Sequence, residues 1–215
     1  MRVSNAARWS IAALVVVVAL IVAIWPRDDA TPDRQANTRP TSPTAQADDV
    51  ADPALAGQLQ PCPQPTPGAA APTTGPLTGL TLTCLNDGSP TDLAAALAGK
   101  PALINLWAYW CAPCATELPY LQQFSARAGD AVTVLTVHSD PSQAKAVARL
   151  ADLSVRLPGL QDGAGRLRAA VSAPPVLPVS VLIRADGSVA DVVAKPFDSV
   201  DEIAAEVQRA LGVAA

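Results

Sequence analysis

The stretch Trp107-Ala108-Tyr109-Trp110-Cys111-Ala112-Pro113-Cys114 decides the fold. Before it, residues 101–106 form a short apolar run after a Gly-Lys turn, which predicts a buried strand. After it, apolar residues recur at helical spacing on one face: Leu118, Leu121 and Phe124. The two cysteines are therefore expected where a strand passes into a helix, with Cys111 at the helix N-terminus.

A cysteine in that position suits thiol–disulfide chemistry. Free backbone N–H groups and the positive end of the helix dipole favour a thiolate over a thiol. Cys111 is the expected nucleophile and Cys114, one turn further on, the resolving cysteine. A zinc site is the first alternative, but there is no second Cys-x-x-Cys and His138 is the only histidine. A purely structural disulfide is the second, and so short a loop would constrain little of the unfolded chain.

The motif Trp110-Cys111-Ala112-Pro113-Cys114, the following Glu117-Leu118-Pro119 and the later Leu177-Pro178-Val179-Ser180 resemble the thioredoxin superfamily. More narrowly, they resemble the membrane-anchored TlpA/ResA-type extracytoplasmic thiol–disulfide oxidoreductases. The resemblance covers about residues 77–211. It implies a thioredoxin fold, and no cofactor or metal is expected.

The resemblance also implies roles for single residues. Pro178 aligns with the family's cis-proline, which lies beside the active disulfide and presents backbone to the client, and Leu177 would face the sulfurs; an ordinary trans proline opening a strand is the alternative. Glu117 would lie near the thiols and tune them, or it is a solvated first-turn glutamate stabilised by the helix dipole. Asn105 replaces the buried aspartate of cytoplasmic thioredoxins and cannot titrate.

The residues around the cysteines complete the expected site. Trp107 and Trp110 are predicted to pack around and cover the sulfurs, and His138 is predicted to be structural rather than catalytic. Ala112-Pro113 lacks one amide donor that could stabilise the thiolate. We therefore expect a potential in the reducing half of the range from roughly −270 mV for thioredoxin to roughly −120 mV for DsbA.

An apolar run precedes the domain. Residues 11–24 contain no polar side chain, and Trp9 and Trp25 flank them. As a helix, residues 9–25 would span about 25 Å, the low end of what crosses a bilayer. A cleaved signal peptide would need small residues just after the run, and a core helix would have nothing to pack on. We predict an uncleaved anchor over residues 1–25.

The basic residues flanking this run are balanced, so they leave the orientation open. The short N-terminus and the redox chemistry favour a cytoplasmic N-terminus, with a single-pass cell-membrane location and an extracytoplasmic catalytic domain. Residues 26–76 hold eleven of the 21 prolines and are predicted to be an extended linker, either a tether of defined reach or a spacer of no required length. Residues 77–215 are the expected thioredoxin-like domain.

Two further cysteines lie outside the motif. Cys62 is flanked by prolines, and Cys84 ends an alternating strand pattern over residues 80–85. We predict a Cys62–Cys84 disulfide that fastens the end of the linker to the first strand, with an entropic contribution of roughly 3 kcal/mol. A second redox pair that relays electrons to Cys111 and Cys114 is the alternative. Four cysteines, an even number, suit an oxidising compartment.

The remaining pattern predicts the order of the elements. Helices are expected over 91–97, 142–150, 166–171 and 199–211, strands over 131–138 and 155–158, and a hairpin over 179–194. Strand and helix alternate around the motif, and a hairpin and a terminal helix follow. This order gives a central mixed sheet with helices on both faces, an α/β thioredoxin fold.

The expected function is reduction of disulfides in extracytoplasmic client proteins. The resemblance implies apocytochrome c as a client and a membrane electron donor of the CcdA/DsbD type. The alternatives are a disulfide-forming oxidase, a thiol peroxidase, whose Thr-x-x-Cys setting the motif region lacks, and a redox-inert tethered binding module. The net charge of −4 offers no case for binding nucleic acid.

Overall fold

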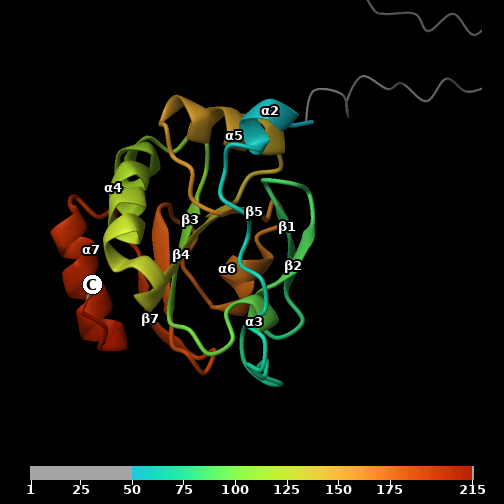
Figure 1. Cartoon of the computed structure of the whole chain (residues 1–215). Coiled ribbons are helices and arrows are strands. Elements are labelled where there is room, and N and C mark those ends of the chain that lie inside the picture. Colours follow the sequence, from blue (N-terminus) through green and yellow to red (C-terminus); the bar gives the residue numbers. More distant parts are fainter. Residues whose placement is uncertain (1–49, 215) are drawn as a thin grey trace, which may run out of the picture. The chain divides into compact units, whose positions relative to one another are not determined.

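The computed structural model describes residues 50–214 (Figure 1). Seven strands form one sheet in the order β2-β1-β5-β4-β3-β6-β7. The strands are β1 (Thr81–Cys84), β2 (Pro90–Asp92), β3 (Ala102–Trp107), β4 (Thr133–His138), β5 (Gly159–Gln161), β6 (Val179–Ile183) and β7 (Val189–Val193). The helices are α2 (Pro53–Ala56), α3 (Leu93–Ala96), α4 (Ala112–Ala128), the 3₁₀ helix η3 (Gly129–Ala131), α5 (Gln143–Asp152), α6 (Arg166–Ala170) and α7 (Val200–Leu211).

The central strand β3 divides the core into two layers. It is buried along its whole length, parallel to β4 and antiparallel to β6. Because successive side chains of a strand point to opposite faces, Leu103 and Trp107 join one hydrophobic cluster, and Ile104 and Leu106 join the other. Asn105 therefore points to the same face as Trp107.

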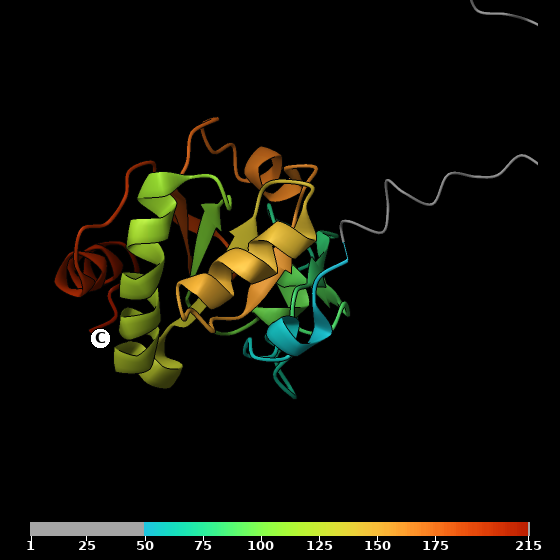
Figure 2. The ribbon, with the colours of Figure 1, turned by 90° about the horizontal axis from the view of Figure 1, so that it is seen from above.

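Helices cover both faces. The first cluster includes residues of α4, α5 and α7, and Figures 1 and 2 show α4 and α7 side by side. The second includes Leu93 of α3 and Leu167 of α6. The predicted central mixed sheet with helices on both faces is confirmed, and the arrangement is a thioredoxin fold.

Two local predictions differ from the structure. Residues 155–158 form no strand, and the strand begins at Gly159, where it pairs with both β4 and β1. The start of the helix predicted over 91–97 is instead strand β2, which pairs with β1. Both strands are only three residues long, too short for an alternating hydrophobic pattern to predict them. The partners of β5 are also distant in sequence.

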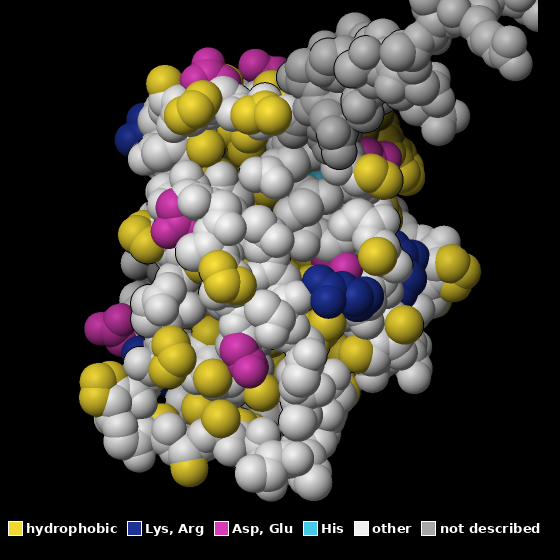
Figure 3. Space-filling view, turned by 90° about the vertical axis from the view of Figure 1, so that its right-hand side faces the viewer, with side chains coloured by type: hydrophobic (Ala, Val, Ile, Leu, Met, Phe, Trp, Pro, Cys, Tyr) yellow, Lys and Arg dark blue, Asp and Glu magenta, His cyan; other side chains and the backbone are white. Residues whose placement is uncertain are grey.

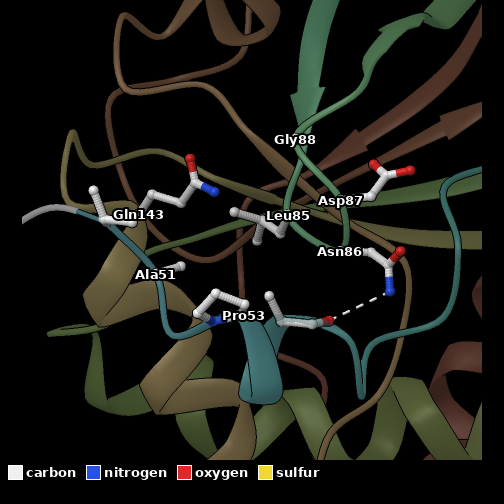
Figure 4. Close-up of a pocket in the computed structure, with 9 residues that line it drawn as sticks. Ala51, Pro53, Leu85, Asn86, Asp87, Gly88 and Gln143 are labelled. Atoms are coloured by element: carbon white, nitrogen blue, oxygen red, sulfur yellow. Dashed lines mark hydrogen bonds between the residues drawn. The ribbon is translucent and has the colours of Figure 1, made fainter.

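The packed part of the chain begins earlier than the predicted start at residue 77. Ala51, Ala56 and Leu59 are buried in the first cluster, and α2 contacts α5. The Asn86 side chain donates hydrogen bonds to the carbonyls of Ala56 and Leu59, at 3.3 and 2.7 Å. Figure 4 shows the first of these bonds beside a cavity of about 360 Å³ between this segment and the β1–β2 turn.

The predicted disulfide between Cys62 and Cys84 is present, with 6.0 Å between the Cα atoms. Both residues are buried, and Cys84 is the last residue of β1. The bond therefore fastens the N-terminal segment, residues 51–62, to the sheet.

Replacing both Cys62 and Cys84 with serine should lower the free energy of unfolding by about 3 kcal/mol, because the bond closes a loop with a sequence separation of 22. Urea denaturation of the two forms, each with Cys111 and Cys114 oxidised, measures the difference. Equal midpoints and slopes would show that the disulfide adds no stability.

The predicted membrane anchor and most of the predicted linker lie outside the described residues. Between residues 50 and 214, no helix has the length and apolar character needed to cross a bilayer. On the face drawn in Figure 3, charged side chains are sparse and hydrophobic ones are scattered among neutral atoms. No continuous charged surface forms on that face.

Candidate active site

The Cys111–Cys114 pair lies where β3 passes into α4, and the two sulfurs are joined at 2.03 Å. Cys111 is the N-cap of α4, and its sulfur accepts a hydrogen bond from the backbone N–H of Cys114 at 3.2 Å. Cys111 retains 5% of its surface exposed, whereas Cys114 retains none. When the pair is reduced, the N-cap position and this N–H would stabilise a thiolate on Cys111. The reachable sulfur is therefore the one that the helix activates.

The two tryptophans of the motif lie in different environments. Trp107 is fully buried, whereas Trp110 is 61% exposed directly beside Cys111. The indole Nε1 of Trp110 donates a hydrogen bond to Asp140 Oδ2 at 3.1 Å. Partial burial alone would raise the pKa of Asp140, but hydrogen bonds from Ser142 N–H and from Trp110 outweigh it and lower that pKa. Asp140 thus stays ionised and fixes the exposed indole of the residue that precedes Cys111.

The peptide bond between Leu177 and Pro178 is cis. Pro178 immediately precedes β6, and Val179 pairs with Leu106 of β3. This register places Pro178 at the end of β3 from which the cysteine motif leaves. Leu177 packs against the cluster that contains both sulfurs.

Glu117 is fully buried, so the solvated first-turn position does not apply. Its Oε2 accepts a hydrogen bond from Asn105 Nδ2 at 2.9 Å, and its Oε1 accepts one from the backbone N–H of Phe197 at 3.1 Å. Asn105 Nδ2 also donates to Ser180 Oγ at 3.1 Å. The Glu117 carboxylate thus joins the motif helix to β3 and to the segment before α7, and Asn105 extends this network to β6.

Burial raises the pKa of Glu117 to about 7, against lowering contributions from the Phe197 and Asn105 hydrogen bonds. Glu117 follows Cys114 by three residues, a spacing that places both side chains on the same face of α4. A carboxyl group whose pKa lies near neutral pH is therefore placed one helical turn from the resolving cysteine. Glu117 is thus a titratable group near the cysteines, whereas its neighbour Asn105 does not titrate.

His138, the last residue of β4, supports the loop that leads to Cys111. It is fully buried, its Nε2 accepts the backbone N–H of Tyr109 at 3.3 Å, and its Nδ1 lies 3.1 Å from Gln161 Oε1. Because Nε2 accepts a hydrogen bond, the ring proton is on Nδ1. These contacts agree with the structural role predicted for this residue.

Three contributors to the site were not predicted. The Phe197 N–H lies 80 residues from Glu117, and no local pattern indicates that contact. The Leu-Pro-Val-Ser motif includes Ser180 but does not indicate its hydrogen bond with Asn105. Asp140 follows β4 by two residues, and its position beyond the end of a strand parallel to β3 is a signal that could have been used.

Comparison with known proteins supports thiol–disulfide chemistry at the Cys111–Cys114 pair. A thioredoxin of Mycolicibacterium smegmatis is 35% identical over 69 residues, 32% of this chain and 60% of its own. The thiol–disulfide oxidoreductase ResA of Oceanobacillus iheyensis is 26% identical over 98 residues, 45% of this chain and 50% of its own. The matched region thus spans about half to 60% of these curated relatives.

A solved structure of a secreted Mycobacterium tuberculosis disulfide oxidoreductase, described as homologous to Escherichia coli DsbE, is 30% identical with a TM-score of 0.53. The alignment covers 60% of this chain and 95% of that one. The model of the Redoxin family matches residues 66–208, more than half of the chain and the whole of the site. The resemblance to ResA-type proteins is confirmed, and the chain belongs to the Redoxin family.

Proposed function

We propose that the protein is a membrane-tethered, extracytoplasmic thiol–disulfide oxidoreductase that reduces disulfides in client proteins. The observation that carries the proposal is the Cys111–Cys114 disulfide at the start of α4, with the Cys111 sulfur capping the helix. The pairing of Val179 with Leu106, which brings Pro178 to the end of β3 that leads into the cysteine motif, supports it. Relatives named as thiol–disulfide oxidoreductases point to the same chemistry.

The exchange has two steps. The Cys111 thiolate attacks one sulfur of a client disulfide, forms a mixed disulfide and expels the other client sulfur as a thiolate, which takes up a proton. Cys114 loses its proton and attacks the Cys111 sulfur, which releases the second client sulfur in the same way. The client gains two electrons and two protons, and the Cys111–Cys114 pair becomes the disulfide seen here. A dithiol reductant must then return two electrons and two protons to this pair.

The location and the partners belong to the same proposal. The apolar run over residues 11–24 supports a membrane anchor, and the Cys62–Cys84 disulfide suits an oxidising compartment outside the cytoplasm. The resemblance to ResA-type proteins supports apocytochrome c as a client and a CcdA/DsbD-type membrane protein as the reductant.

The reduction potential of the Cys111–Cys114 pair tests the direction of electron flow. The full chain, in membranes, is equilibrated with glutathione buffers, its thiols are trapped, and the Cys111–Cys114 peptide is quantified by mass spectrometry. A reductase should give a potential between roughly −270 and −200 mV. A value of roughly −120 mV would contradict this direction and assign the protein as an oxidase.

A further inference from the structure

The loop between α6 and β6 is short of backbone hydrogen-bond donors. Three of its five residues from 174 to 178 are prolines, which have no N–H group. The Val176 N–H donates to the Pro174 carbonyl at 2.9 Å. The Leu177 N–H has no hydrogen-bond partner within residues 50–214. It is therefore the single unused backbone donor in this loop.

One side chain holds this loop. Arg168 Nη1 donates hydrogen bonds to the carbonyls of Pro174 and Val176, at 2.9 and 3.4 Å. The Arg168 carbonyl also accepts the N–H of Ala173 at 3.0 Å. Arg168 makes no ion pair with any residue in the described part of the chain. Its charge is therefore directed at the two loop carbonyls, and such charge-assisted bonds are stronger than neutral ones.

The loop that Arg168 holds lies at the redox site. It ends at the cis bond before Pro178, and the pairing of Val179 with Leu106 brings it to the end of β3 that leads into the cysteine motif. The Val176 side chain is 48% exposed, so this part of the loop is open to a partner. An extended client segment at the disulfide would meet the Leu177 amide.

We propose that Arg168 is a positioning residue for client binding. By holding the carbonyls of Pro174 and Val176, it keeps the loop in the conformation that presents the Leu177 N–H to a backbone carbonyl of an extended polypeptide client. This inference rests on the proposed function. A client with an extended backbone uses the contact, whereas a small thiol such as glutathione has no extended backbone to align and reacts with the sulfurs directly.

Reduction of insulin by the full chain, with dithiothreitol as reductant, tests the proposal. We expect Arg168→Ala to raise KM for insulin about tenfold, because the charge-assisted bonds that hold the loop are lost. We expect kcat and the rate of exchange with glutathione to stay unchanged. Arg168→Lys should give an intermediate KM, because an ammonium group can still donate to a carbonyl.

Arg184→Ala is the matched control. Arg184 Nη1 also donates to a backbone carbonyl, that of Val189 at 2.9 Å, but just past the opposite end of β6. We expect this variant to leave KM unchanged. Equal KM values for Arg168→Ala and Arg184→Ala would overturn the inference, and so would an equal loss of glutathione exchange and insulin reduction in Arg168→Ala.

Amide hydrogen exchange gives a second readout. In the Cys114→Ser chain linked through Cys111 to a single-cysteine peptide, exchange at Leu177 should be slower than in the free chain. Adding Arg168→Ala should remove this protection. Unprotected Leu177 in the linked chain that retains Arg168 would overturn the inference. Failure of the unaltered chain to reduce insulin would overturn the proposed function instead, so the two failures are distinguishable.

Discussion

Replacing Cys111 with serine is expected to lower the rate of insulin reduction to that of the uncatalysed reaction. Cys111 is the less buried member of the pair and its sulfur caps α4, so its loss removes both the nucleophile and the group that the helix activates. Turbidity of reduced insulin, followed with equal amounts of variant and unaltered chain, gives the rate. Activity equal to that of the unaltered chain would rule out the redox mechanism and favour a binding module.

Two companion variants separate the roles of the cysteines. Cys114→Ser should leave the first attack intact but block resolution, so a mixed disulfide with the client accumulates and can be isolated on a non-reducing gel. The double replacement of Cys62 and Cys84 should retain insulin reduction, because this buried pair pins the N-terminal segment. A loss of activity in the double variant under conditions where it is folded would support the electron-relay alternative.

Ionisation of Glu117 should cost the folded state about 3 kcal/mol between pH 4.5 and pH 8. Burial raises the pKa of Glu117 from 4.5 to about 7. Between these values the folded chain binds more protons at this group than the unfolded chain does, so stability falls as pH rises through the window and is level above it. About 2.5 units at about 1.4 kcal/mol each give the expected size.

Glu117→Gln isolates this effect. Glutamine does not titrate, and whatever it loses at the Asn105 and Phe197 donors is independent of pH. Urea denaturation of both chains from pH 4.5 to 8 should therefore show the difference in stability shifting by about 3 kcal/mol in favour of glutamine. Parallel stability curves across this range would contradict the raised pKa. In the unaltered chain, the rate at which Cys114 resolves the mixed disulfide should show a step near pH 7, where Glu117 titrates. This step should be absent in Glu117→Gln.

Local signals in the sequence were enough for the centre of the fold. The apolar run before the motif and the helical spacing after it predicted β3 and α4. The turn sequence Ala185-Asp186-Gly187, between two strand-like runs, predicted the β6–β7 hairpin. The hydrophobic residues of these elements recur at the spacing typical of strands and helices. The two strands of the hairpin are close in the chain, and the motif before β6 resembles that of the family. The roles of the two motif cysteines and of the proline before β6 were predicted from the short motifs over residues 110–114 and 177–180.

Contacts between distant segments could not be predicted in this way. The environment of Glu117 depends on Asn105 and on the Phe197 amide, which only the folded chain brings together. Residues 51–62 resemble a linker in composition, yet a few spaced apolar side chains, the hydrogen bonds from Asn86 and the Cys62–Cys84 disulfide dock them on the domain. The short strand β5 is specified by its neighbours β1 and β4 rather than by its own pattern.

The rate of alkylation of each cysteine is the most direct test of the central claim, that α4 activates the Cys111 sulfur. The Cys62–Cys84 bond is left intact, the Cys111–Cys114 pair is reduced, and iodoacetamide modification is followed by mass spectrometry at pH 7. The account predicts that Cys111 reacts at least about tenfold faster than Cys114 and faster than the same residue in the urea-unfolded chain. Equal, slow modification of both thiols in the folded chain would contradict it.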